Sequence, residues 1–155
     1  MKIIDAHIHY SNITSFHDTA SNISNLSYSR QGLETEMREN NVVLSIAMGL
    51  TETKANGFPD YSTQTPMEID LEKDAPTKIV HCLGINPYKL DREHLSLLEE
   101  KIQLPNVVGF KIYLGYYPSY AYDEKYKPIY ELAEKYNVPV VFHTGDTYSE
   151  RGLLK

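Results

Sequence analysis

Five short apolar runs recur along the chain, and they constrain its fold more than any other feature. Each run is of strand length and rich in β-branched residues, and most are apolar on both faces, as strands inside a parallel sheet are. The runs cover residues 3–9, 42–48, 79–85, 107–113 and 138–143. We therefore predict that these five segments are strands of one buried sheet.

Helical patterns lie between the apolar runs. Residues 29–40 carry apolar positions at helical spacing, and residues 65–68 have the spacing of a capping box with proline at the first helical position. Asp91 can cap a helix that extends to Ile102, and residues 126–136 predict another helix. Residues 11–28 are polar and predict a loop after the first strand. Strands that alternate with helices indicate an α/β fold.

The strand count leaves two α/β architectures open. Five strands in 155 residues suit a doubly wound open sheet of the flavodoxin type, which the count alone favours. The same βα units also suit part of an eight-stranded barrel. Motifs therefore have to decide between the two architectures.

Composition excludes several classes of partner. The chain has 15 Lys and Arg against 21 Asp and Glu, a net charge of −6, whereas a protein that binds nucleic acid needs positive charge. The N-terminus has no signal-peptide pattern, and no apolar run approaches the length of a membrane helix. The only cysteine, Cys82, fits a reducing compartment and is predicted to be a buried structural thiol. We expect a cytoplasmic protein that binds neither nucleic acid nor membrane.

The first apolar run contains a motif with metal-binding chemistry. In a strand, residues two apart point to the same side, so Asp5, His7 and His9 share one face. Two imidazoles placed in this way can converge on one cation, and neutral imidazole suits zinc and other late divalent metals. The alternative is a pair of histidines that bond only to backbone and loop groups.

A third histidine, His143, ends the fifth run and precedes the turn-like residues 144–146. The carboxyl ends of parallel strands meet at one rim of the sheet, so we expect His143 at the same rim as His7 and His9. Three nitrogen ligands leave a fourth position open for water, as a catalytic zinc requires. The three histidines together favour a metal site.

Lys111 lies in the middle of the fourth run, in phase with Gly109 and Tyr113. A lysine that faces the interior of a sheet must be paired, modified or extended to solvent. Three roles stay open: a carbamate that bridges two metals, a cation that holds an anionic substrate, and a side chain that reaches the rim.

Tyrosines are concentrated after this run: the chain has 13 Tyr and no Trp, and many of them lie in residues 113–122. Aromatic residues in a loop beside a site can form the wall of a pocket, or pack on the next helix. Three later tyrosines have helical spacing and are predicted core residues: Tyr126, Tyr130 and Tyr136.

Residues 4–9, 109–113 and 141–146 together resemble the amidohydrolase-related branch of the amidohydrolase superfamily. The resemblance runs in order over essentially the whole chain and implies a TIM-type (β/α)8 barrel rather than an open sheet. It places His7 and His9 at the metal ligands of the first strand and His143 at the ligand of the fifth. Lys111 occupies the position of the lysine that bridges two metals as a carbamate in binuclear members.

The resemblance also implies a reaction. Such proteins use one or two divalent ions, here expected to be zinc, to polarise a substrate and to activate water. The water attacks a C–N or C–O bond of a small-molecule substrate, and some relatives instead decarboxylate aromatic or unsaturated acids.

The family barrel has eight strands, whereas this chain carries about five βα units. The histidine of the sixth strand and the aspartate of the eighth have no counterpart, so no general base is assigned. We expect residues 1–155 to be the N-terminal portion of one truncated barrel domain that lacks most activity. Because a sheet cut after five strands leaves an edge exposed, we also expect a homo-oligomer.

The prediction is therefore a metal-dependent hydrolase, with Asp5 supporting the ligands. Tyr113, Tyr116 and Asp146 are the expected substrate contacts. Two alternatives stay open: a metal-dependent decarboxylase, which Lys111 and the tyrosine-rich loop would suit, and a non-catalytic half-barrel that binds a ligand or metal.

Overall fold

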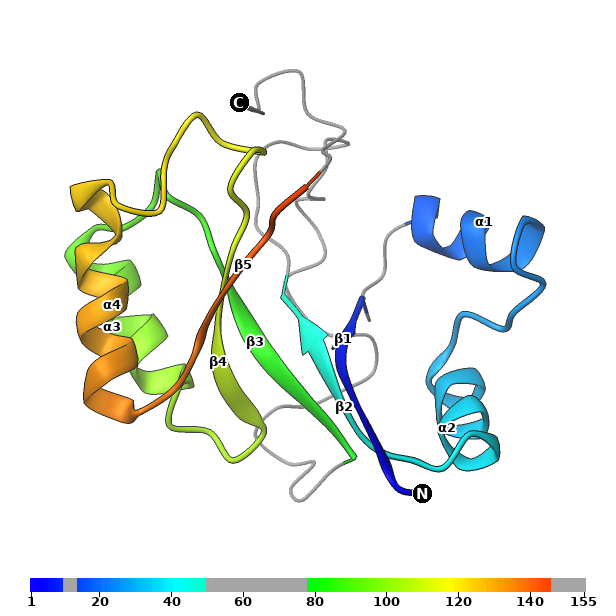
Figure 1. Ribbon diagram of the computed structural model, residues 1–155. Coiled ribbons are helices and arrows are strands. Elements are labelled where there is room, and N and C mark those ends of the chain that lie inside the picture. Colours follow the sequence, from blue (N-terminus) through cyan, green and yellow to red (C-terminus); the bar gives the residue numbers. More distant parts are fainter. Residues whose placement is uncertain (10–13, 50–77, 146–155) are drawn as a thin grey trace.

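The structure is a computed structural model that describes residues 1–9, 14–49 and 78–145 (Figure 1). The capping signal at residues 65–68 and the expected substrate contact Asp146 lie outside the described residues. No helix in the described part of the chain is long and apolar enough to span a membrane.

Five strands form one parallel sheet, and its strand order decides the architecture. The strands are β1 (Ile3–Ile8), β2 (Val42–Met48), β3 (Ile79–Ile85), β4 (Val107–Ile112) and β5 (Val140–Phe142). Each strand pairs in parallel with the next one in the sequence, in the order β1-β2-β3-β4-β5. A flavodoxin-like sheet would place β1 between β2 and β3, whereas a barrel keeps the order of the chain. The prediction of a TIM-type barrel with about five βα units is therefore confirmed, and the described strands form a half-barrel.

The helices lie outside the curved sheet, with α2 beside β1 and β2, and α3 and α4 beside β3 and β4 (Figure 1). They are α1 (Thr14–Asn22), α2 (Arg30–Glu39), α3 (Arg92–Lys101), the single 3-10 turn η1 (Glu124–Tyr126) and α4 (Lys127–Tyr136). Local signals fix their starts: the Asp91 carboxylate accepts a hydrogen bond from the His94 N–H at 2.8 Å. The Ser29 hydroxyl accepts from the Gly32 N–H at 3.0 Å.

The prediction that residues 11–28 form a loop is wrong, because α1 occupies residues 14–22. Its Ser, Thr and Asn residues are poor helix formers, so local propensity does not indicate this helix. The tertiary contact described for this helix is at its end, where Ala20 lines a small cavity of about 130 Å³ together with Leu26 and Ile8 of β1.

The larger hydrophobic core lies between β3, β4 and β5 and the two helices α3 and α4. Phe110, Tyr126 and Ile129 are fully buried within it, and Tyr130 and Tyr136 pack against it, which confirms the three tyrosines as core residues. A smaller core joins α2 to β2.

The cores fix which strand residues face the interior of the half-barrel. Phe110 and Ile112 of β4 pack toward the helices, so the alternate residue Lys111 faces inward. Phe142 packs outward in the same way, which turns His143 inward. Ile8 packs against the core beneath α2, so His7 and His9 also face the interior.

The first strand departs from the prediction that the strands are buried on both faces. Every residue of β1 up to His7 is exposed, and Ile4 keeps 59% of its surface accessible. The reason is topological: among the described strands β1 lies at the edge of the sheet and pairs with β2 alone.

Candidate metal centre

His7 and His9 meet at the carboxyl end of β1. Their Nε2 atoms lie 3.3 Å apart, and their rings meet edge to face with centroids 5.1 Å apart. The Asp5 carboxylate accepts a hydrogen bond from the His7 backbone N–H at 3.1 Å. This bond holds the backbone of β1 at His7, one residue before the strand ends at Ile8. Asp5, His7 and His9 are predicted to share one face of the strand, and in the structure the imidazoles of His7 and His9 are in direct contact.

The distance between the two Nε2 atoms matches a shared metal. Zinc binds imidazole nitrogen at about 2.0–2.1 Å in tetrahedral geometry, which separates two such nitrogens by about 3.3–3.4 Å. Without a metal, the same 3.3 Å lets the two rings share an N–H···N hydrogen bond, whose donor depends on the tautomers. The donor pair thus fits a divalent cation.

Both imidazoles are poised to be neutral. Burial, followed by the positive charges of His7, Lys111 and His143, lowers the pKa of His9 to about 4. Burial, Lys111 and His143 also lower the pKa of His7, against the opposing charge of Asp5. Neutral imidazoles keep the nitrogen lone pairs that a metal needs. Because the charges of Lys111 and His143 lower the pKa of both histidines, these two residues lie close to the histidine pair.

His143 lies one residue beyond β5, where its backbone N–H donates to the carbonyl of Ile112 at 2.8 Å. Its ring stacks on Tyr113 with centroids 5.8 Å apart and meets the edge of Tyr116 at 5.0 Å. Both tyrosines are buried. The two predicted substrate contacts therefore surround a predicted metal ligand.

Lys111 is fully buried, with 0% of its surface exposed. Within the described residues its ammonium has no hydrogen-bond partner, and it lies 5.2 Å from the centre of the Tyr113 ring. Burial lowers its pKa. The interpretation that Lys111 reaches solvent at the rim is wrong, because its side chain is fully buried. A buried amine without a partner agrees with modification or with a bound anion.

Cys82 lies on the same side of the sheet and interacts electrostatically with Lys111. Burial raises the pKa of this thiol to about 11, so it stays protonated at neutral pH. The prediction of a buried structural thiol is confirmed.

The structure brings some predicted site residues together and leaves others apart. His7 and His9 are in contact, and Lys111 and His143 face the same interior. Among residues 1–9, 14–49 and 78–145, no three His, Cys, Asp or Glu side chains are close enough to hold one metal ion. The complete ligand set therefore stays a prediction.

One contributor at this site was not predicted from the sequence. The hydroxyl of Tyr28 donates to the backbone carbonyl of His9 at 2.9 Å and so holds the end of β1. Tyr28 lies 19 residues along the chain from His9, and no spacing rule relates the two positions.

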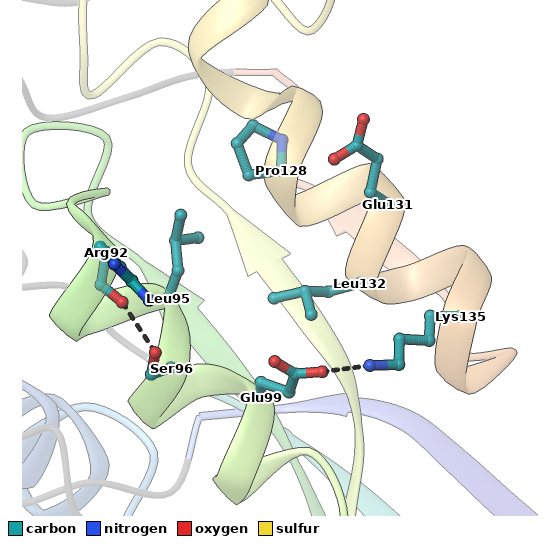
Figure 2. Close-up of a pocket in the computed structure, with 8 residues that line it drawn as sticks. All are labelled: Arg92, Leu95, Ser96, Glu99, Pro128, Glu131, Leu132 and Lys135. Carbon is teal, nitrogen blue, oxygen red and sulfur yellow. Dashed lines mark hydrogen bonds and ion pairs between the residues drawn. The ribbon is translucent and has the colours of Figure 1, made fainter.

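A separate groove of about 470 Å³ lies between α3 and α4, outside the sheet (Figure 2). Leu95 and Leu132 line its floor, and the ion pair between Glu99 and Lys135 crosses it. Because these helices cover the outer face of the sheet, the groove is not part of the histidine site.

Comparison with known proteins agrees with the fold and with the chemistry of the site. A family model described as TatD related DNase matches residues 4–154. Searches of the curated proteins and of the solved structures found no match. The matched family consists of metal-dependent hydrolases on a TIM barrel, related to the amidohydrolases whose motifs the sequence resembles, and its members use divalent metals. The chain belongs to the TatD-related DNase family of metal-dependent hydrolases.

Proposed function

We propose that this chain forms the metal site of a hydrolase that cleaves a C–N or C–O bond of a small-molecule substrate with activated water. One observation carries the proposal: the Nε2 atoms of His7 and His9 converge to 3.3 Å, the separation expected for two ligands of one tetrahedral ion. His7 and His9 would hold the metal, and His143 and Lys111 would complete the site from the facing strands. Two imidazole nitrogens favour zinc over magnesium or calcium.

A bound divalent ion supplies Lewis acidity, which polarises the scissile bond and lowers the pKa of water toward neutrality. The residues of this chain prepare the position. Asp5 holds the backbone of His7 by accepting its N–H, and Tyr28 holds the carbonyl of His9. Burial and neighbouring positive charge keep both imidazoles unprotonated at neutral pH. Tyr113 and Tyr116 exclude water from the side of the site that His143 occupies.

Charge supports a small molecule as the substrate. The net charge of −6 opposes the approach of a polyanion, because nucleic-acid binding depends on phosphate neutralisation by Lys and Arg. If Lys111 stays unmodified and does not bind the metal, its buried ammonium suits a single anionic group rather than a phosphate backbone. We also propose a cytoplasmic protein that assembles with copies of itself, which fits its single cysteine and its edge strand β1.

Phosphodiester hydrolysis is the second candidate. The matched family is described as a DNase family, and metal-assisted attack of water serves phosphodiesters as well as amides and esters. The two candidates share the metal site and differ in the substrate.

An activity screen separates the candidates. The zinc-loaded chain would be incubated with p-nitrophenyl esters and anilides, with bis(p-nitrophenyl) phosphate and with a single-stranded oligonucleotide. Cleavage of an ester or anilide that His7→Ala abolishes and His94→Ala preserves supports the proposal. Cleavage of the phosphodiesters alone would transfer it to the second candidate.

Two further readouts cover the remaining alternatives. Carbon dioxide released from an aromatic acid such as 2,6-dihydroxybenzoate would contradict hydrolysis and indicate a decarboxylase. Zinc binding without turnover of any probe is the result expected both of a non-catalytic binding module and of a metal site that lacks a general base.

A further inference from the structure

We propose that Tyr113 and Tyr116 are positioning residues, whose rings set the orientation of the His143 imidazole toward the metal site. The inference rests on the proposed function, because it assigns these rings a role at the same site. It replaces the expectation that the two tyrosines contact substrate.

The three rings form a closed aromatic cluster. His143 stacks on Tyr113 at an interplanar angle of 25°, and the edge of Tyr116 meets it at 72°. Tyr113 and Tyr116 in turn meet edge to face, with centroids 5.8 Å apart. All three pairs lie in the distance range of favourable aromatic contacts. One neighbour therefore fixes the plane of the imidazole and the other limits its rotation within that plane.

His143 needs such support because of its place in the chain. It lies beyond the last residue of β5, and the following residues Thr144 and Gly145 are exposed. Its backbone is held by the hydrogen bond to Ile112, but pairing of the backbone does not set the side-chain torsions. Groups that hydrogen-bond to the second nitrogen of a metal-binding imidazole fix its orientation and strengthen metal binding, and rings packed on the imidazole restrict the same torsions. Here the two rings supply a fixed wall on two sides.

The buried state of the two tyrosines favours this role over substrate contact. Tyr113 keeps 1% of its surface exposed and Tyr116 keeps 6%, which leaves little area for a ligand. Burial raises the pKa of the Tyr113 phenol, so it stays neutral. Its hydroxyl has no hydrogen-bond partner among the described residues, so the ring makes the contacts that the structure describes.

The loop after β4 is built to present Tyr116. Gly115 adopts a φ of 88°, a conformation that turns the chain and that residues with a side chain rarely adopt. Leu114 and Tyr117 then pair across the turn, and Ser119 donates its N–H to the carbonyl of Tyr117 at 2.8 Å. The ring of Tyr116 is thus carried by a fixed turn.

The same loop is tied to the helix layer. The hydroxyl of Tyr126, which is fully buried beside α4, donates to the hydroxyl of Ser119 at 3.3 Å. The hydroxyl of Tyr130 donates to the carbonyl of Ala121. These two contacts hold the loop after β4 against η1 and α4.

Metal affinity of matched variants tests the inference. Tyr116→Leu removes the ring, Tyr116→Phe keeps the ring without the hydroxyl, and Tyr117→Leu removes an equally buried neighbouring ring that contacts Tyr88. Zinc affinity would be measured by calorimetry on the full chain, and the visible spectrum of the cobalt-substituted chain would report ligand geometry. We expect Tyr116→Leu to weaken zinc binding about 10- to 100-fold and to change the cobalt spectrum. Tyr116→Phe and Tyr117→Leu should behave as the unsubstituted chain.

Each other outcome overturns the inference in a recognisable way. Unchanged affinity and spectrum in Tyr116→Leu would show that the ring does not position His143. Equal losses in Tyr116→Phe would assign the effect to the hydroxyl, and equal losses in Tyr117→Leu would assign it to general packing. Absence of zinc binding in the unsubstituted chain would instead contradict the proposed function itself, before any variant is compared.

Discussion

Acidification should destabilise this fold through His81, a histidine outside the metal site. His81 lies on β3 and keeps 5% of its surface exposed, and its Nδ1 atom has no hydrogen-bond partner among the described residues. Burial lowers its pKa from the ordinary 6.5 to about 4. Between these two pH values, His81 therefore binds a proton in the unfolded chain and stays neutral in the folded protein.

The sign and size of the effect follow from this difference. Above pH 6.5 both states hold a neutral His81, so it contributes no pH dependence there. Between pH 6.5 and about 4 the unfolded chain binds a proton first, and the free energy of unfolding falls with decreasing pH. The complete difference is worth about 3 kcal/mol, a large fraction of the stability of a small domain.

Urea unfolding of the chain and of His81→Leu, followed by circular dichroism between pH 7 and pH 4, isolates this effect. Carboxylates and His9 titrate in both proteins, so their contributions cancel in the comparison. We expect the unsubstituted chain to lose about 3 kcal/mol more than the variant over this interval. Parallel pH profiles for the two proteins would refute the reasoning, because His81 would then be protonated in the folded state at its ordinary pKa.

Three further changes test the packing of the half-barrel. Asp91→Ala removes the cap of α3 and should lower the free energy of unfolding by about 1 kcal/mol in urea, and an unchanged midpoint would contradict the role of the cap. Gly109→Ala would place a methyl group 2.7 Å from the carbonyl oxygen of Pro139, so we expect it to cost about 1–3 kcal/mol; a melting temperature equal to that of the unsubstituted chain would exclude this close approach of β4 and β5. Cys82 should react with iodoacetamide only in denaturant, because burial raises its pKa to about 11; rapid alkylation of the native chain, measured by mass spectrometry, would contradict its burial.

The parts of the fold that could be predicted are those encoded by local pattern. The bounds of β2 and β3 agree with the predicted segments 42–48 and 79–85, because β-branched apolar runs favour strands. The cap at Asp91 was also predicted, since it depends on a residue within one turn of its partner, and the predicted helix start at residue 29 agrees with the cap at Ser29. Strand periodicity likewise predicted that Lys111 faces the interior.

Features that depend on distant contacts could not be predicted. Helix α1 has weak propensity and forms where its end packs beside β1, and the exposure of β1 follows from its place at the edge of the sheet. The order of the strands, which separates a barrel from an open sheet, is also absent from local pattern. At the site, the spacing of His7 and His9 indicated convergence, whereas the contact of Tyr28 with His9 arises only from the tertiary fold.

The metal site itself can be tested by zinc binding to the chain, because binding needs the histidine pair and no substrate. Calorimetric titration would compare the unsubstituted chain with His7→Ala and His9→Ala, and with His94→Ala on the outer helix α3 as the control. We expect the unsubstituted chain and His94→Ala to bind zinc, and we expect loss of either imidazole at the end of β1 to abolish tight binding. Zinc bound equally by His7→Ala and the unsubstituted chain, or by neither, would contradict the proposed metal site.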